Sequence, residues 1–327
     1  MKCAASLLAV TLGFSLNAAE SPELLKQGQT IPLPGVKGRF DHFSIDAKGN
    51  RLFVAALGNN TVEVIDVAAG KRLHSIPGMS KPQGVLFLAD RNELLVANGD
   101  DSTLKFLDTA NFKVKHSLPD MPDADNVRLD PHSGATWVGY GDGALAQVTS
   151  GSYKSAATIK LAGHPESFQL EKQGSRVFVN VPDSKEIVVA DAAKHEVLAK
   201  WPMKQFQANF PMALDESNHR LFVGCRKPAR LVIFDTEAGK PVADLAISGD
   251  TDDLFYDAKR KRIYISCGDG FIDVVEQSSA DNYQRVAKIP TAAGARTCFF
   301  SSDLDRLYLA VPDRGNQKAE IRVLKAQ

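Results

Sequence analysis

Short apolar runs recur along the chain, and each is bounded by turn residues. The segment 40–73 holds three such runs separated by Asp, Gly and Asn, and the later stretch "ELLVANGDDSTLKFLDTANFKV" repeats this skeleton with different residues. Runs of β-branched and aromatic residues between turn signals predict β-strands. Helical periodicity is nearly absent, so the pattern predicts an all-β protein built from repeated hairpins.

The repeat has a fixed internal spacing. Its marker is an apolar triplet, which occurs seven times, at 52–54, 94–96, 136–138, 177–179, 221–223, 263–265 and 307–309. Nine positions before each triplet stands another apolar residue, in order Phe43, Val85, Val127, Phe168, Met212, Leu254 and Cys298. Four predicted strands in a unit of about 40–45 residues are the signature of a β-propeller blade.

The two ends of the repeat array complement each other. The last copy supplies three strands before Gln327, and the unassigned β-type run "GQTIPLPG" at 28–35 precedes the first copy. We expect this run to complete the last blade, because an unpaired blade edge would expose its backbone groups. The predicted fold is a single seven-bladed β-propeller with four-stranded antiparallel blades, spanning residues 20–327.

The first repeat carries a family resemblance. The segment "NRLFVAALGNNTVEVIDVAAGK" resembles the units of the YVTN/YncE-like family of exported bacterial β-propellers, which combine a strand ending in "VAN" with "VxVID" and "TGK". The resemblance extends over essentially the whole chain after residue 19 and is weakest in the third and sixth copies. It implies the propeller fold and export. It implies little about activity, because propellers host many functions.

Residues 1–19 predict a cleaved secretory signal peptide. Lys2 precedes an apolar run from Ala4 to Leu16, and Ala18 and Ala19 supply the small residues of a cleavage site. The run is shorter than the roughly 20 apolar residues that a membrane-spanning helix needs. We therefore expect a periplasmic or secreted protein without a membrane span.

Three cysteines follow the predicted signal peptide, namely Cys225, Cys267 and Cys298. An odd number cannot pair completely in an oxidising compartment. No CxxC or close His/Cys cluster is present, so the sequence favours buried, unreactive thiols over a zinc site.

The charge balance restricts the partners. The chain has 39 Lys and Arg against 39 Asp and Glu, so no overall field favours nucleic acid or an anionic membrane. No GxSxG motif or Ser/His/Asp set is evident. We expect a monomer that binds a small polar ligand or another exported protein and does not bind nucleic acid.

Local charge is concentrated where the blades should meet. The loop before the innermost strand of each blade opens at one mouth of the central channel. The two positions before each apolar anchor therefore form a ring, which reads Asp41-His42, Gln83-Gly84, Asp125-Asn126, Glu166-Ser167, Phe210-Pro211, Asp252-Asp253 and Arg296-Thr297. Five carboxylates converge there against one His and one Arg. Such carboxylates should recruit a cation, share protons or remain hydrated.

The ring predicts a ligand-binding mouth. The candidate binding residues in it are Asp41, His42, Asp125, Asn126, Glu166, Asp252, Asp253 and Arg296. Arg39 and Arg226 lie on the same face and would either hold an anion or pair with acidic residues of the sixth copy. His164 lies near this face but is expected to be too far from His42 to share a metal ion with it.

Two functions from different classes remain open. The first is a non-catalytic module that binds a ligand or a protein through the acidic mouth and requires no cofactor. The alternative is a calcium-dependent lactonase similar to gluconolactonase-type propellers, in which Asp41, Asn126 and Asp253 would hold the divalent cation. The Glu-Gly-Pro segment typical of those enzymes is replaced here by "FDHF". A haem-binding propeller is a further possibility, although the sequence has no CxxCH motif.

Overall fold

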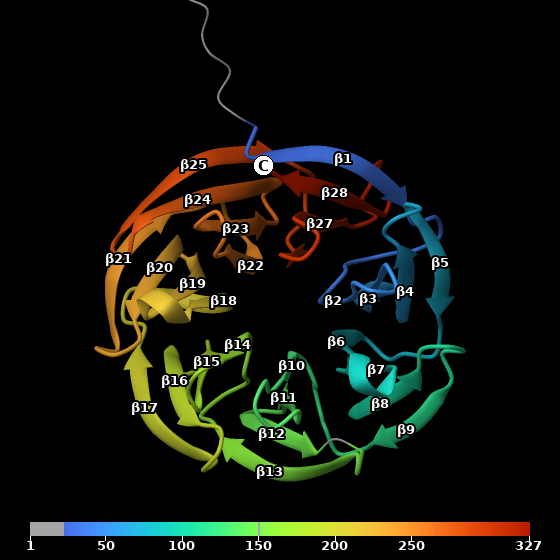
Figure 1. Ribbon diagram of the computed structural model, residues 1–327, viewed down its shortest axis with the longest axis horizontal. Helices are drawn as coiled ribbons and strands as arrows, with labels where there is room; N and C mark the ends of the chain where they lie inside the picture. The colour runs from blue at the N-terminus through green and yellow to red at the C-terminus, as the bar shows by residue number, and fades with distance from the viewer. Residues whose placement is uncertain (1–22, 150) are drawn as a thin grey trace, which may run out of the picture.

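The computed structural model describes residues 23–149 and 151–327, which form seven four-stranded antiparallel sheets around a central channel (Figure 1). The predicted signal peptide, residues 1–19, lies outside the described residues. The seven-bladed β-propeller predicted from the repeat is confirmed.

The strands follow one another outward from the channel in each blade. The first blade contains β2 (Phe43–Asp46), β3 (Arg51–Ala56), β4 (Thr61–Asp66) and β5 (Lys71–Ile76). The second and third contain β6 (Pro82–Leu88), β7 (Glu93–Asn98), β8 (Thr103–Asp108) and β9 (Val114–Leu118), then β10 (Val127–Leu129), β11 (Thr136–Tyr140), β12 (Ala144–Thr149) and β13 (Lys154–Lys160). The fourth and fifth contain β14 (Phe168–Leu170), β15 (Arg176–Val181), β16 (Glu186–Asp191) and β17 (Glu196–Pro202), then β18 (Gln207–Asp215), β19 (Arg220–Lys227), β20 (Ala229–Asp235) and β21 (Lys240–Ala246). The sixth and seventh contain β22 (Thr251–Asp257), β23 (Arg262–Cys267), β24 (Phe271–Ser279) and β25 (Asn282–Pro290), then β26 (Cys298–Ser301), β27 (Arg306–Val311), β28 (Glu320–Ala326) and β1 (Leu25–Pro32). Short 3-10 helices η1 (Leu57–Asn59), η2 (Ala89–Arg91) and η3 (Glu216–Asn218) occupy three of the turns.

The register of the innermost hairpin is identical in all seven blades. Each apolar anchor pairs with the last residue of its triplet, as Phe43↔Val54, Val85↔Val96, Val127↔Val138, Phe168↔Val179, Met212↔Val223, Leu254↔Ile265 and Cys298↔Leu309. A slip of one residue would turn every apolar side chain to the opposite face of the sheet. The constant sequence spacing therefore places equivalent residues at equivalent positions around the channel.

The turn of the first hairpin shows how polar residues set this register. Oδ1 of Asp46 accepts a hydrogen bond of 2.9 Å from the backbone N–H of Gly49, and Oδ2 accepts one of 2.8 Å from Nη2 of Arg51. Asn50 adopts the left-handed conformation with φ of 55°, which Asn tolerates better than most residues. These contacts hold the turn between the end of β2 at Asp46 and the start of β3 at Arg51.

The ring is closed by the N-terminal strand. β1 pairs antiparallel with β28, from Leu25↔Ala326 to Pro32↔Glu320, so the last sheet has the order β1-β28-β27-β26 (Figure 1). This confirms the closure expected from the sequence.

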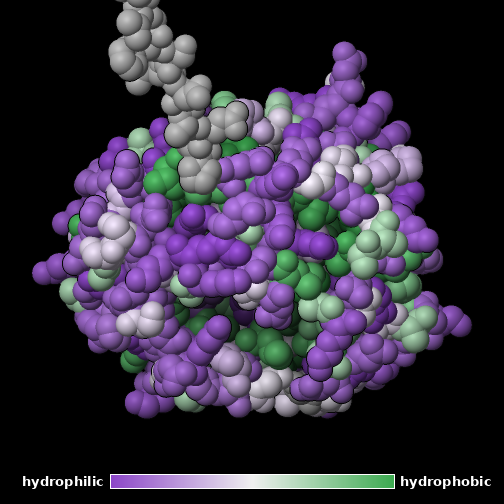
Figure 2. All heavy atoms as spheres, turned by 45° about the horizontal axis from the view of Figure 1, so that its top comes forward, coloured by the Kyte–Doolittle hydropathy of each residue, from purple (hydrophilic) through white to green (hydrophobic). Residues whose placement is uncertain are grey.

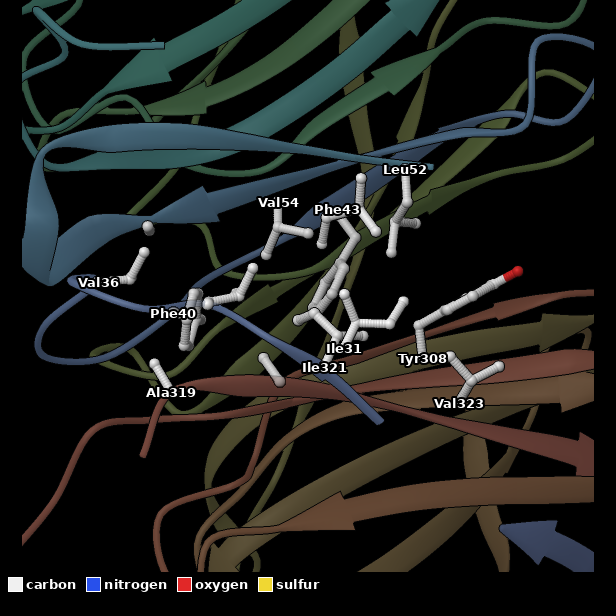
Figure 3. Packing of buried hydrophobic residues seen from close by; sticks show 14 of the residues in the cluster. Ile31, Val36, Phe40, Phe43, Leu52, Val54, Tyr308, Ala319, Ile321 and Val323 are labelled. Atoms are coloured by element: carbon white, nitrogen blue, oxygen red, sulfur yellow. The ribbon is translucent and has the colours of Figure 1, made fainter. Parts of the chain in front are cut away.

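The hydrophobic core lies between neighbouring blades. At the closure, Ile31 of β1 and Ile321 of β28 pack with Phe43 and Tyr308 across the interface of the last and first blades (Figure 3). Ile31, Ile321 and Tyr308 are completely buried. Full burial of an Ile or Phe side chain contributes about 1.5–3 kcal/mol, so each blade is stabilised chiefly by its neighbours.

The three cysteines are buried and unpaired, as expected. Burial raises the pKa of the Cys225 thiol to about 12 and that of Cys298 well above its ordinary value. Thiols that stay protonated at neutral pH are poor nucleophiles and poor metal ligands.

In the described part of the chain, no helix has the length and apolar character required to cross a membrane.

Candidate functional site

The predicted ring residues meet at one end of the channel. They line a polar cavity of about 180 Å³, whose lining includes Arg39, Asp41, His42, Asp125, Asn126, Glu166, Arg226, Asp252 and Arg296. Asp253 lies one step further into the channel, beside His42. We call these residues, together with His164, which also lines the cavity, the mouth cluster.

The backbone holds the cluster through a hydrogen-bond pattern that recurs from blade to blade. In the first blade, the N–H of Asp41 donates to the carbonyl of Ala55 at 2.8 Å, and Ala55 returns a bond to His42 at 3.0 Å. In the third blade, Asp125 and Asn126 exchange the same pair of bonds with Gly139, at 2.9 and 3.0 Å. These bonds continue the innermost ladder beyond the strands and fix which side chains enter the cavity.

His42 is enclosed by carboxylates. Its Nε2 lies 3.5 Å from Oδ1 of Asp41 and 3.6 Å from Oδ1 of Asp125, while its Nδ1 lies 3.5 Å from Oδ1 of Asp253. The other oxygen of Asp253 accepts a 2.9 Å hydrogen bond from the backbone N–H of Cys298. Asp41 and Asp253 therefore face opposite nitrogens of the imidazole.

His164 completes the cluster from the opposite side of Asp125. Its Nδ1 lies 2.7 Å from the carbonyl of Gly141, which can only accept, so Nδ1 carries the proton and Nε2 is directed inward. That Nε2 lies 3.8 Å from Oδ2 of Asp125. One carboxylate thus stands between the two imidazoles, with one oxygen toward each.

Sequence reasoning missed this role of His164. The expectation that it could not share one ion with His42 is consistent with the structure, in which the two histidines belong to separate groups of potential ligands. Both groups nevertheless contain Asp125. The sequence did contain one indication of this role: His164 stands two residues before Glu166, in the loop that precedes an innermost strand.

The charges in the cluster perturb one another. Burial raises the pKa of Asp41 to about 8 despite His42, and burial together with Asp125 raises the pKa of Glu166 to about 8. Burial opposes charge on His164, yet Asp125 and the Gly141 carbonyl raise its pKa to about 9. Without a bound cation, the cluster retains protons near neutral pH on groups that normally ionise below it.

The pKa of Asp125 is shifted in the opposite direction, downward. Burial alone would raise its pKa, but His164 and His42 hold the pKa of this carboxyl well below its usual range. Burial opposes charge on His42, but the carboxylates of Asp41, Asp125 and Asp253 raise the pKa of this imidazole well above its ordinary value. Asp125 is therefore the ionised centre of the cluster.

The arginines of the mouth are paired within the protein. Arg226 forms an ion pair with Asp252, and Arg296 contacts Asp252 and Asp250 at 2.8 and 2.9 Å. Arg39 lies 3.6 Å from Asp41. Of the two roles predicted for these arginines, pairing with acidic residues of the sixth copy is confirmed for Arg226.

Two buried oxygens in the cluster lack hydrogen bonds. Oδ1 of Asp125 and Oδ1 of Asn126 accept none within the described residues, although Asp125 is only 7% exposed and Asn126 only 1%. Leaving a buried acceptor unsatisfied costs about 1–3 kcal/mol. Both residues line the cavity, so these acceptors are available to a ligand bound there.

The potential ligand atoms form two overlapping groups. One consists of Asp41, His42 and Asp125, the other of Asp125, His164 and Glu166, and within each group the ligand atoms lie within 4.8 Å of one another. The calcium trio expected for a lactonase is arranged differently, because the imidazole of His42 stands between Asp41 and Asp253.

Comparisons with known proteins establish the fold. No family model and no curated protein sequence matches this chain. A chain in the structure of Kuenenia stuttgartiensis hydrazine synthase is similar, with 17% identity, a TM-score of 0.74, and coverage of 88% of this chain and 98% of that one. A chain in the structure of a mitotic checkpoint complex has 15% identity, a TM-score of 0.78, and coverage of 98% and 99%. At these identities the likeness concerns architecture alone, that of a seven-bladed β-propeller.

Proposed function

We propose that this chain is an exported, non-catalytic binding module of the YVTN/YncE-like kind, and that its mouth cluster binds a divalent transition-metal ion. The observation that carries the proposal is the placement of Asp125 between two imidazoles, with Oδ1 3.6 Å from Nε2 of His42 and Oδ2 3.8 Å from Nε2 of His164.

These separations support metal binding better than direct ion pairing. Charge-assisted N–H···O hydrogen bonds close to about 2.7–2.9 Å. Two ligands on one tetrahedral ion with bonds of about 2.1 Å lie about 3.4 Å apart, which is near the 3.5 and 3.6 Å between Nε2 of His42 and its two carboxylates. Oδ1 of Asp125 accepts no hydrogen bond within the described residues, so it is available as a ligand to such an ion.

The surroundings of the imidazoles support the same function. Nδ1 of His164 is bonded to the carbonyl of Gly141, and Nδ1 of His42 faces Asp253. Ligating histidines typically have one ring nitrogen held by a carbonyl or carboxylate, which orients the other toward the metal. His164 follows this pattern with a hydrogen bond of 2.7 Å, and His42 has a carboxylate oxygen 3.5 Å from its Nδ1.

The donor atoms define the class of cation. Calcium prefers six to eight oxygen ligands, whereas imidazole combined with carboxylate suits zinc, iron, nickel or copper. His42 and His164 each supply one imidazole nitrogen to a separate group, and both groups use Asp125. We therefore propose a preference for zinc-type ions over calcium at either of these two groups of ligands.

Calorimetric titration of the chelator-treated protein with ZnCl₂, MnCl₂ and CaCl₂ tests the proposal. We expect zinc to bind at least about tenfold more tightly than calcium, and His164→Gln to weaken zinc binding by about tenfold or more. His132→Gln is the matched control, because that exposed histidine lies outside the cluster. An absence of zinc binding, or equal weakening by both substitutions, would refute the proposal.

The calcium-dependent lactonase is the second proposal, supported by the buried, unpaired Oδ1 of Asn126. It requires Asp41 and Asp253 to reach one ion with Asn126, although they face opposite nitrogens of His42. Hydrolysis of simple lactones that depends on calcium and is lost in Asn126→Ala would favour it over the binding module. No hydrolysis with calcium present would exclude it.

Binding of another exported protein stays a prediction. A chain of similar fold occurs in a mitotic checkpoint complex, and an exposed propeller face can serve as a docking surface.

A further inference from the structure

The channel continues beyond the mouth cluster into a second, larger cavity. This cavity has a volume of about 650 Å³ and is lined by the innermost strands of the blades. His42 and Asp253 line its upper end, and its other end extends to Glu216 and Ser217 of η3. The layer formed by His42 and Asp253 therefore separates a polar cavity from a deeper chamber, which we call the central chamber.

The wall of the central chamber combines polar and apolar side chains, and several of the apolar ones are aromatic. Phe87, Phe255 and Phe299 line it and are only partly buried, and Leu86 and Leu170 are in the same state. The rings of Phe255 and Phe299 meet edge to face with centroids 5.6 Å apart. The face visible in Figure 2 is mostly hydrophilic, with hydrophobic side chains exposed in patches around its centre. Apolar surface left open in a concave site favours a ligand that covers it.

Two cationic side chains line this wall, the partly buried Arg128 and the exposed Lys172. Arg128 on β10 lines the chamber, its Nη1 donates a 2.8 Å hydrogen bond to the carbonyl of Val127, and its guanidinium lies 5.6 Å from the ring centre of Phe168. Among the described residues no carboxylate forms an ion pair with it, in contrast to Arg226 and Arg296 at the mouth. Burial lowers the pKa of the Arg128 guanidinium, against the attraction of Asp253 and Asp125. Its remaining N–H groups are available to an anion in the chamber.

We infer that the central chamber binds an organic monoanion with an aromatic body, whose carboxylate or sulfonate pairs with Arg128 while its rings pack against Phe87, Phe255 and Phe299. A guanidinium presents two parallel donors to such a head group, and aromatic rings pack edge to face or offset against phenylalanines. The volume lies within the range of about 300–1,000 Å³ typical of small-molecule sites. The inference is independent of metal binding at the mouth, because Arg128 belongs to neither group of metal ligands.

Two fluorescent probes that differ only in charge test the inference. 1-Anilinonaphthalene-8-sulfonate carries an anionic head on an aromatic body, and N-phenyl-1-naphthylamine is the same molecule without the sulfonate. We expect the folded protein to bind one sulfonate probe per chain, and Arg128→Met to weaken this binding by about tenfold or more. Binding of the neutral probe should change less than about threefold, since its contacts are apolar.

Three further variants keep the test decisive. Arg314→Met removes an exposed arginine outside the chamber and should leave both probes unaffected. His164→Gln, which should impair metal binding, should also leave the sulfonate probe unaffected, so that failure of one site does not imply failure of the other. Arg128→Lys retains the charge and should recover part of the sulfonate binding, provided that near-ultraviolet circular dichroism shows native packing. Binding of more than one probe per chain, or equal affinity of the Arg128→Met and parent proteins for the sulfonate, would overturn the inference.

Discussion

Nε2 of His42 in the first blade lies 3.6 Å from Oδ1 of Asp125 in the third blade, although the second blade separates them around the ring. Both residues stand just before an innermost strand, where the backbone of each blade approaches the axis. The mouth is narrow enough for side chains of non-adjacent blades to meet across it. A substitution in one blade is therefore expected to change the protonation of groups in several others.

Asp125→Asn should destabilise the metal-free protein. The carboxylate is the counter-ion of two buried imidazoles, so its neutralisation leaves His42 and His164 without their shared partner. We expect the free energy of unfolding to fall by about 3 kcal/mol, measured by urea denaturation in the presence of a chelator. Asp123→Asn is the control, since its side chain is 62% exposed, and it should change stability by less than about 1 kcal/mol. Equal stability of both variants would contradict the central position of Asp125.

Stability of the metal-free protein should decrease from pH 6 to pH 9. The folded-state pKa values of Asp41 and Glu166 are raised to about 8 and that of His164 to about 9. The folded protein then holds protons that the unfolded chain has already released, and stability falls with pH wherever this is so. The loss from the carboxyls begins above their ordinary pKa and is complete above about pH 8. Urea midpoints across this range measure the effect, and a midpoint that rises toward pH 9 would be the contrary result.

The closure of the ring should depend on apolar contacts of the N-terminal strand. Ile31 is completely buried between the last and first blades. Replacing it with Ala removes buried methyl groups and leaves a cavity, so we expect Ile31→Ala to cost about 2–5 kcal/mol in the free energy of unfolding. Thr30→Ala, at an exposed position of the same strand, should cost less than about 1 kcal/mol. Similar losses from both would show that the strand contributes through its backbone bonds alone.

The thiols of the folded protein should resist chemical modification. Cys225, Cys267 and Cys298 are buried, and burial raises the pKa of Cys225 to about 12. Because only the thiolate reacts, we expect labelling by 5,5′-dithiobis(2-nitrobenzoate) at pH 8 to be at least about a thousandfold slower than for free cysteine. The Cys3→Ser variant restricts the measurement to these three residues, and full labelling in guanidinium is the positive control. Rapid labelling of the folded protein would contradict this packing.

The fold was accessible from the sequence because its signal is periodic. The spacing between Phe43 and the triplet ending in Val54 recurs in every copy, and the ladder that pairs them recurs with it. The closure by β1 was accessible for a related reason, since a blade with three strands requires a fourth. No such periodicity marks His164, which lies in a loop whose path is set by the blades around it.

The sequence by itself determined which residues precede each innermost strand at the mouth, because residues at equal positions of a repeat must occupy equal positions around one axis. Only the tertiary structure decided how their side chains divide that space: Asp125 lies between His42 and His164, Asp253 faces the far side of the same imidazole, and the arginines pair with aspartates. It also decided that Arg128 lines the central chamber and forms no ion pair with a carboxylate within residues 23–149 and 151–327. The physical reason is that strand register follows from local alternation and turn chemistry, whereas contacts across the channel depend on its width and on side-chain direction, which all seven blades set together.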